Sequence, residues 1–320
     1  MSEKKLMKGN EAIAEAAIRG GCRYFFGYPI TPQNEIPEYM SWRIREVGGD
    51  FVQAESEVAA INMVYGAAGA GARAMTSSSS PGISLKQEGI SYIACAELPC
   101  VIVNMVRSGP GLGGILASQC DYFQTVKGGG HGDYKLLTYA PSTVQEAVDI
   151  LYYAFDKADE YRTPVCILGD GLLGQIMEPV TFPEMKEMPD PSTKSWAVTG
   201  THHGKDKTLA SSIYIDPNLG EAQNNHLVEK FERIAQKETQ CEEFMCDDAE
   251  IILTGYGSVG RIIKSAIYML REKGIKAGLV RPITLMPFPT KVYEKYAAKA
   301  SVKRFLTVEL SMGQFVEDVK

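Results

Sequence analysis

The feature that most constrains the fold of this chain is a repeated alternation of short apolar runs with amphipathic helical segments. The apolar runs are nearly continuous, as at 100–106, where Asn104 is the one polar residue, and at 164–168. Continuous runs are typical of strands buried on both faces, and such strands occur in parallel sheets that carry helices on both sides. The first 190 residues therefore predict an α/β fold built on a mostly parallel sheet.

The expected elements of this part follow from apolar periodicity and turn residues. Helices are predicted at 9–19, from Pro32 to Arg45, from Ser56 onward, at 85–96 and from Ser142 to Tyr161, and strands at 24–28, 51–53, 72–77, 100–106 and 164–168. Residues 77–82 are interpreted as a loop. Ser142 and Gln145 are interpreted as a capping box that opens the last helix.

The regular alternation stops between about residues 186 and 247, which contain prolines, histidines and runs of charge. We therefore divide the chain into a larger domain at 1–190, a linker or excursion at 191–247 and a smaller α/β domain at 248–320. In the smaller domain, strands are predicted at 251–253, 277–280 and 305–308, and a helix at 258–273. The chain stops where a further helix would begin, so the second domain is expected to be truncated.

Composition excludes several classes of protein. The 320 residues include 33 basic and 39 acidic side chains, a net charge of −6, and there is no long basic run to attract a nucleic acid. No apolar stretch is long enough to span a membrane, and the N-terminus lacks the apolar core of a secretion signal, so we expect a cytoplasmic protein. The seven cysteines form no CxxC pair, and His202 and His203 do not complete a ligand set, so no metal site is expected.

Polar side chains follow the carboxyl ends of the predicted strands, where ligands bind in open parallel sheets. These side chains are Thr31, Glu55, Glu57, the serines at 77–80 and Arg107. Each of them alone could be an ordinary cap or turn residue, and Thr31 before Pro32 is a good helix N-cap. Together they favour a site for a small carboxylate, with Arg107 as the anion-binding fork and Glu57 available for proton transfer.

Several strings of residues resemble a known family. Residues 26–32 (FGYPITP), residues 53–57 (QAESE), Arg107 and residues 280–282 (VRP) are similar to the α subunit of 2-oxoacid:ferredoxin oxidoreductases, in order along essentially the whole chain. The type that acts on the branched-chain 2-oxoisovalerate is the most similar. The resemblance implies a pyrimidine-type thiamine-diphosphate-binding domain, followed by a smaller domain like the C-terminal domain of transketolase.

The resemblance also implies roles for individual residues. Thr31 and Arg107 would hold the carboxylate of the 2-oxoacid. Glu57 would hydrogen-bond the pyrimidine ring nitrogen of thiamine diphosphate and so favour the form of the ring whose exocyclic nitrogen removes a proton. Tyr28 and Pro29 would contact the same cofactor. Glu55 is the alternative to Glu57 for the ring contact.

The implied reaction is the oxidative decarboxylation of a 2-oxoacid to an acyl-CoA, with ferredoxin as the electron acceptor. A β subunit would carry the diphosphate and magnesium motif, and γ and ferredoxin-like subunits would carry iron–sulfur clusters. Residues 108–125 contain no Lys, Arg or His but offer Leu112, Ile115 and Leu116, so a branched-chain substrate is preferred to 2-oxoglutarate, which remains the alternative.

Two short motifs and one histidine have competing interpretations. Gly169-Asp170-Gly171 imitates a diphosphate motif, but paired asparagines do not follow at the required spacing, so it is interpreted as a turn. Residues 255–260 (GYGSVG) imitate a dinucleotide loop, with Arg281 in the place of an acidic ribose ligand. An NADP-dependent oxidoreductase therefore stays open as an alternative, as does a non-catalytic assembly subunit. His131 is interpreted as a surface loop residue, with a position near the substrate as the alternative.

Overall fold

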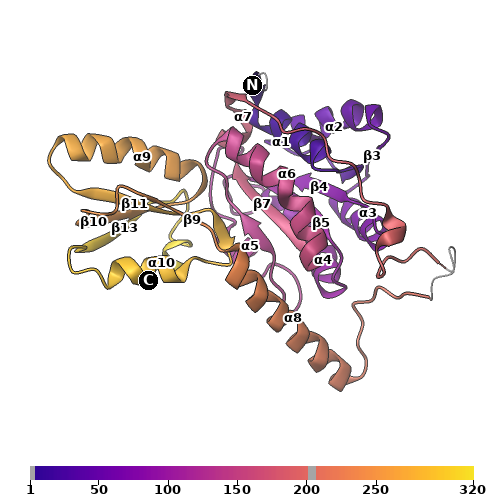
Figure 1. Cartoon of the computed structure of the whole chain (residues 1–320). Helices are drawn as coiled ribbons and strands as arrows, with labels where there is room; N and C mark the ends of the chain where they lie inside the picture. Colours follow the sequence, from indigo (N-terminus) through magenta and orange to yellow (C-terminus); the bar gives the residue numbers. More distant parts are fainter. Residues whose placement is uncertain (1–3, 201–206) are drawn as a thin grey trace.

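A seven-stranded sheet organises the larger of two α/β units in the computed structural model, which describes residues 4–200 and 207–320 (Figure 1). In spatial order its strands are β12 (Thr284–Met286), β6 (Leu137–Tyr139), β7 (Pro164–Asp170), β5 (Cys100–Val106), β4 (Ala74–Ser78), β2 (Tyr24–Gly27) and β3 (Asp50–Gln53). All neighbouring strands are parallel except β12, which pairs antiparallel with β6. The predicted α/β fold with a parallel-dominated sheet is confirmed.

The two faces of this sheet are both covered, as the continuous apolar strands predict. The covering helices are α1 (Gly9–Arg19), α2 (Glu35–Glu46) and α6 (Val144–Tyr161) on one face, and α3 (Glu57–Gly69) and α4 (Ser80–Cys95) on the other. Successive residues of β5 alternate between them: Val101 and Val103 join the first core, and Cys100 and Ile102 join the second.

The smaller unit lies beside the larger one and contains a four-stranded sheet (Figure 1). Its strands, in spatial order, are β13 (Arg304–Thr307), β10 (Ile251–Thr254), β11 (Ala277–Pro282) and β9 (Cys241–Phe244), of which only β9 is antiparallel to its neighbour. The apolar residues of α9 (Gly257–Glu272) and α10 (Thr290–Ala297) belong to separate cores of this unit.

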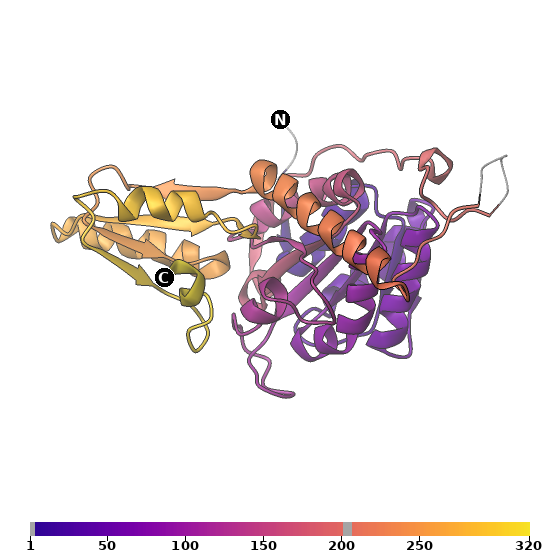
Figure 2. The same ribbon diagram turned by 90° about the horizontal axis from the view of Figure 1, so that it is seen from below.

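The segment predicted as a linker, 191–247, contains regular structure. It includes the long helix α8 (Pro217–Glu238), which lies across the larger unit in Figure 2, and the strand β9, which completes the smaller sheet. Conversely, β12 lies within the predicted second domain but pairs with the larger sheet. Most residues of α8 are polar, and the helix packs on the protein through the buried side chains of Leu227 and Ile234.

Helix starts differ from the predictions by a few residues. The serines predicted as a loop end β4 and begin α4. Thr143, rather than Ser142, caps α6, because its side chain accepts from the backbone N–H of Glu146. Several short elements were not predicted, since they are too short to show periodicity: β1 (Lys5–Lys8), α5 (Tyr122–Val126), β6, α7 (Gly171–Gln175), β8 (Met177–Val180), the 3₁₀ turn Pro191–Thr193, β12 and α11 (Val316–Val319).

Two findings concern membrane-spanning helices and metal sites. Within residues 4–200 and 207–320, no helix has the length and apolar character needed to cross a membrane. The same residues contain no group of three His, Cys, Asp or Glu side chains placed to hold a metal ion. His202 and His203 lie outside the described residues.

Candidate active site

The residues singled out in the sequence lie around one rim of the larger sheet. The strands β2, β4 and β5 are parallel, with β4 between the other two, so their carboxyl ends open onto the same edge. Thr31 follows β2, Ser78 ends β4 and Arg107 follows β5. Glu57 follows the edge strand β3 as the first residue of α3. The parallel topology therefore brings together side chains that are far apart in the sequence.

Glu57 is buried at this rim, with 6% of its surface exposed. Ser56 caps α3 by accepting from the backbone N–H of Ala59 at 3.2 Å, which fixes the direction in which Glu57 enters. A Cβ atom at Gly82 would lie 2.7 Å from Oε1 of Glu57, so the carboxylate rests directly against the start of α4. Glu55 is exposed in the preceding turn. The two glutamates thus occupy different environments.

Unpartnered polar groups surround the Glu57 carboxylate. Within the described residues Glu57 has no hydrogen-bond partner, and the buried hydroxyls of Ser78 and Ser79 have none either. The Ser78 Oγ atom would be 2.1 Å from a Cβ atom at Gly82, which places it beside the carboxylate. A buried carboxylate and two free hydroxyls suit a heteroaromatic ring that carries both donors and acceptors. These residues therefore fit the aminopyrimidine part of thiamine diphosphate.

Arg107 and Thr31 are brought together, but not as the sequence predicts. The Arg107 guanidinium donates to the backbone carbonyls of Thr31 and Leu112, at 2.9 and 2.8 Å, and its Nε atom is buried without a partner. The prediction that Thr31 is a helix N-cap is wrong, because α2 begins at Glu35 and Asn34 precedes it. The Thr31 hydroxyl instead accepts from the Asn34 amide at 3.2 Å. Each terminal nitrogen of Arg107 keeps one further N–H, and these donors, the unpaired Nε and the Thr31 hydroxyl are the groups left for an anion.

A cavity of about 540 Å³ opens beside Thr31. Its wall includes Ile115 and Leu116 from the loop after β5, both of which are exposed, while Leu112 of the same loop is exposed and does not line the cavity. Glu35 also lines the cavity, and its carboxylate accepts from Asn10 at 2.7 Å. Burial favours protonation of Glu35, but the hydrogen bonds from Asn10 and its other partners outweigh it and lower the pKa of this carboxyl. The cavity therefore combines an aliphatic wall with a fixed negative charge.

The remaining predicted residues lie farther from this arrangement. Tyr28 and Pro29 are exposed directly after β2, and the Tyr28 carbonyl accepts from the Gln33 amide at 3.3 Å. His131 is exposed and has no hydrogen bond within the described residues. Its loop is anchored to α4 instead, through a hydrogen bond of 3.2 Å from Tyr134 to Gln87. This arrangement supports the interpretation of His131 as a surface residue.

The first motif, Gly169-Asp170-Gly171, is a strand-to-helix junction rather than the predicted turn, because Gly169 and Asp170 end β7 and Gly171 begins α7. Asp170 caps the short helix α7, accepting from the backbone N–H groups of Leu172 and Leu173, both at 3.0 Å. Its second carboxylate oxygen accepts from the Ser258 hydroxyl at the start of α9. Asp170 therefore joins the two units and has no oxygen free for a metal or diphosphate.

The second motif, the glycine-rich residues 255–260, is explained by close packing of α9 on β11. A Cβ atom at Gly260 would lie 2.3 Å from the Arg281 side chain, so the glycine lets that arginine pass beneath α9. Arg281 is buried and donates to Glu146 at 2.7 and 3.1 Å and to Glu242 at 2.6 Å. An arginine committed to two carboxylates cannot serve the 2′-phosphate of NADP, which removes the main support for the nicotinamide alternative.

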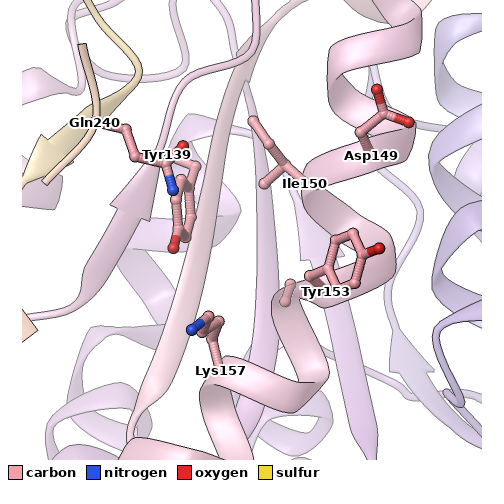
Figure 3. A pocket seen from close by; sticks show the side chains of 7 residues that line it. Tyr139, Asp149, Ile150, Tyr153, Lys157 and Gln240 are labelled. Carbon is pink, nitrogen blue, oxygen red and sulfur yellow. The ribbon is translucent and has the colours of Figure 1, made fainter. Parts of the chain in front are cut away.

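Another cavity, of about 400 Å³, lies on the side of α6 (Figure 3). Three of its polar side chains have protein partners: Lys157 donates to Glu238 at 2.8 Å, and Asp149 accepts from Gln145 at 2.9 Å. Tyr139, facing Ile150 and Tyr153 across the cavity, also bonds Glu238, at 3.4 Å. Because these groups are already paired, this cavity is a weaker candidate than the rim of the sheet.

Sequence reasoning missed Lys86 and Gly82. Lys86 is fully buried near Glu57, although a lysine is expected on the surface. Its position contains a usable signal: it lies three residues after Ile83 and four before Ile90, on the apolar stripe of α4. Gly82 gives no such signal, because its importance depends on what approaches it from another helix.

Comparisons with known proteins agree with this geometry. Residues 15–242 match the family model described as pyruvate flavodoxin/ferredoxin oxidoreductase, thiamine diphosphate-binding. Residues 249–320 match the model of pyruvate:ferredoxin oxidoreductase core domain II. Both matches cover the units seen in the structure.

Individual relatives extend along the whole chain. Ketoisovalerate oxidoreductase subunit VorB from Methanothermobacter thermautotrophicus is 51% identical, over 99% of this chain and 89% of that protein. The 2-oxoglutarate synthase subunit KorA from the same organism is 35% identical, over 100% of this chain and 91% of that protein. The solved 2-oxoglutarate:ferredoxin oxidoreductase of Magnetococcus marinus, with 2-oxoglutarate, coenzyme A and succinyl-CoA bound, superposes with a TM-score of 0.88 at 26% identity, over 99% of this chain and 60% of that one. A split-gene transketolase shares the fold, with a TM-score of 0.57 at 12% identity, over 98% of this chain and 83% of that one.

Proposed function

Because the chain belongs to the thiamine diphosphate-binding pyruvate flavodoxin/ferredoxin oxidoreductase family, we propose that it is the α-type subunit of a 2-oxoacid:ferredoxin oxidoreductase that acts on branched-chain 2-oxoacids. The enzyme converts the 2-oxoacid and coenzyme A to an acyl-CoA and carbon dioxide and passes two electrons to ferredoxin. The observation that carries the proposal is the buried, unpartnered Glu57 at the carboxyl edge of a sheet whose family binds this cofactor.

In this proposal Glu57 holds a proton at the pyrimidine ring nitrogen, and the free hydroxyls of Ser78 and Ser79 face the same ring. Tyr28 and Pro29, exposed after β2, would contact the same cofactor. When bound, thiamine diphosphate supplies the carbon nucleophile and accepts the electron pair left by decarboxylation. Only 6% of the surface of Glu57 is exposed, and the low dielectric of its surroundings would strengthen the hydrogen bond that it makes there.

Arg107 and Thr31 are proposed to bind the substrate carboxylate. The remaining N–H groups of the Arg107 guanidinium and the Thr31 hydroxyl would orient it, while the carbonyls of Thr31 and Leu112 hold the guanidinium in place. Hydrogen bonds from a fixed guanidinium to an anion are among the strongest in proteins. This contact positions the keto group without itself taking part in bond breaking.

The cavity wall supports a branched-chain substrate. Ile115 and Leu116 offer an apolar surface to an aliphatic tail. The second carboxylate of 2-oxoglutarate would meet the Glu35 carboxylate there, and Lys8, the cation beside it, is already paired with Glu35 at 3.2 Å, so the added negative charge is disfavoured. The 51% identity to a ketoisovalerate oxidoreductase subunit, against 35% to a 2-oxoglutarate synthase subunit, points in the same direction.

Partner subunits are proposed to supply the other parts of the reaction. Among the described residues there is no cluster for a metal ion, so we propose that a β subunit supplies the magnesium and diphosphate site. Iron–sulfur clusters would reside on γ and ferredoxin-like subunits, and ferredoxin would accept the electrons. A non-catalytic assembly role is the remaining alternative, and it predicts that no residue of this rim affects turnover.

The proposal is tested with the reconstituted complex. Glu57→Gln is expected to lower kcat by a hundred- to ten-thousand-fold, the usual range for a lost acid–base partner, while the complex still assembles. Glu55→Gln is the matched control, because it removes an exposed carboxylate two residues away, and it should be nearly neutral. Full turnover by the Glu57 variant would refute the proposed site, and a larger loss in the Glu55 variant would exchange the two roles. A higher kcat/KM for 2-oxoglutarate than for 2-oxoisovalerate would refute the substrate assignment alone.

A further inference from the structure

The backbone of Arg107 is held by a side chain from another element of the fold. The backbone N–H of Arg107 donates to the Ser80 hydroxyl at 3.0 Å, and this hydroxyl donates in turn to the Arg107 carbonyl at 3.3 Å. Ser80 is the first residue of α4, and 8% of its surface is exposed. A hydroxyl has one hydrogen to donate, and Ser80 spends it, together with an acceptor site, on the residue that follows β5.

Asn104 fixes the position of Ser80. It is the one polar residue of β5 and is 1% exposed, so its amide needs partners inside the protein. Its carbonyl oxygen accepts from the backbone N–H of Ser80 at 3.2 Å, and its amide nitrogen donates to the Asp121 carboxylate at 2.9 Å. The first N–H groups of a helix have no partner within the helix, and Asn104 satisfies this one. The start of α4 is therefore attached to the middle strand of the sheet.

The start of α4 contacts both parts of the candidate site. Two residues after Ser80, a Cβ atom at Gly82 would lie 2.7 Å from Oε1 of Glu57, so this part of the helix rests against the proposed ring contact. Ser80 itself bonds the backbone of Arg107, the proposed anchor of the substrate carboxylate. Neighbouring residues of one helix therefore set the distance between these two parts of the site.

The hydrogen bonds of Ser80 also fix the point from which the Arg107 side chain and the following loop extend. Arg107 forms an isolated antiparallel bridge with Ala117, at the far end of that loop. From the same backbone position its guanidinium reaches the carbonyls of Thr31 and Leu112, at 2.9 and 2.8 Å. A backbone that shifts at Arg107 would therefore move the guanidinium relative to the rest of the rim.

We propose that Ser80 is a positioning residue for substrate binding: its hydroxyl ties Arg107 to the start of α4 and so holds the guanidinium at a fixed distance from the cofactor contact at Glu57. The inference rests on the proposed role of Arg107. Ser80 does not contact the substrate in this proposal, because its hydroxyl is occupied by the Arg107 backbone.

The proposal predicts an effect on KM rather than on kcat. A contact to the substrate carboxylate is made before and during the reaction alike, and the loss of such a contact raises KM while kcat changes little. A misplacement of about 1 Å can cost roughly a hundredfold, and the loss of one positioning hydroxyl should have a smaller effect, about tenfold. Cofactor binding should not change, because Gly82 and Glu57 remain in place.

The experiment measures steady-state kinetics of the reconstituted complex. Ser80→Ala is expected to raise the KM for 2-oxoisovalerate about tenfold, whereas the KM for coenzyme A and the calorimetric affinity for thiamine diphosphate with magnesium should be unchanged. Ser80→Thr keeps the hydroxyl and should bring the KM back close to that of the unaltered complex. Ser91→Ala is the matched control, because Ser91 is also buried on α4 but its hydroxyl donates within its own helix, to the Glu88 carbonyl at 2.6 Å.

A double variant tests whether Ser80 acts through Arg107. Arg107→Lys should raise the KM for 2-oxoisovalerate by itself. Adding Ser80→Ala to it should raise the KM much less than Ser80→Ala does alone, because residues that act through one contact are not additive. Independent, additive effects would overturn the proposed coupling.

The other outcomes separate the role of Ser80 from that of Arg107. A KM that is normal in Ser80→Ala but raised in Arg107→Lys would overturn the role of Ser80 and leave the proposed function standing. A KM that is normal in both would overturn the carboxylate role of Arg107, and the inference with it. An equal rise in Ser91→Ala or in Ser80→Thr would show that the contact of the hydroxyl with Arg107 is not responsible. A rise confined to Ser80→Ala, and absent on the Arg107→Lys background, would establish the contact.

Discussion

Replacing Arg281 should destabilise the contact between the two α/β units. Arg281 on β11 belongs to the smaller unit, and its guanidinium donates twice to Glu146 on α6 of the larger unit, at 2.7 and 3.1 Å. Its Nε atom donates to Glu242 on β9 at 2.6 Å. Burial opposes the charge of Arg281, but the two carboxylates outweigh it and raise the pKa of the guanidinium. The ion pairs are therefore intact at any pH at which the carboxylates are charged.

The expected loss of unfolding free energy depends on how deeply Arg281 and its two partners are buried. The Arg281 side chain is 4% exposed, and its partners are 20% and 26% exposed. Breaking a buried ion pair by removing one partner usually costs about 3–5 kcal/mol, because the remaining charge loses its compensation. Water reaches both carboxylates in part, so we expect a loss near the lower end, about 3 kcal/mol, for Arg281→Met. At roughly 2 °C per kcal/mol for a chain of this size, the melting temperature should fall by about 6 °C.

Arg261→Met is the matched control for this measurement. Arg261 also joins the two units, through Glu178 of β8, but its side chain is 51% exposed. An exposed ion pair contributes about 0–1 kcal/mol, so this variant should change the melting temperature by no more than about 2 °C. Thermal unfolding of both variants, followed by circular dichroism, provides the comparison. Equal effects of the two substitutions would refute the reasoning from burial.

Three further predictions concern the cofactor site and its surroundings. Calorimetry on the isolated chain should detect only weak binding of thiamine diphosphate, because the proposed site for the diphosphate lies on a partner; tight, magnesium-dependent binding would contradict this. Gly82→Ala should lower kcat at least tenfold in the assembled complex, because the new Cβ atom would displace Ser78 and Glu57, while the melting temperature should change little. A variant with normal kcat would show that the close approach is unimportant. Between about pH 7 and the ordinary lysine pKa, the folded protein binds fewer protons at Lys86 than the unfolded chain, so the free energy of unfolding should rise with pH in this range. Lys86→Met should make this rise smaller, which is measured by urea unfolding at a series of pH values.

The sequence by itself determined the class of fold and the rim on which the site lies. Nearly continuous apolar runs such as Cys100–Val106, in which only Asn104 is polar, are typical of a sheet covered on both faces, and this is a local property of each strand. Parallel strands then deliver the residues after their carboxyl ends to one edge, so the grouping of Thr31 and Arg107 is predicted from pattern alone. Local signals were less exact at helix starts, because neighbouring serines and threonines compete for the cap, as at Thr143 and Ser142.

Only the tertiary structure decided which polar residues of that rim are buried and what they face. Glu55 and Glu57 are the same residue type two positions apart, and they differ because Gly82 and Ser78, from other elements, enclose one of them. Likewise Lys86 is buried against β4, and Arg281 lies between two carboxylates, through packing of segments distant in sequence. Burial and charge compensation depend on the sum of such long-range contacts, and no local pattern in a single sequence encodes that sum.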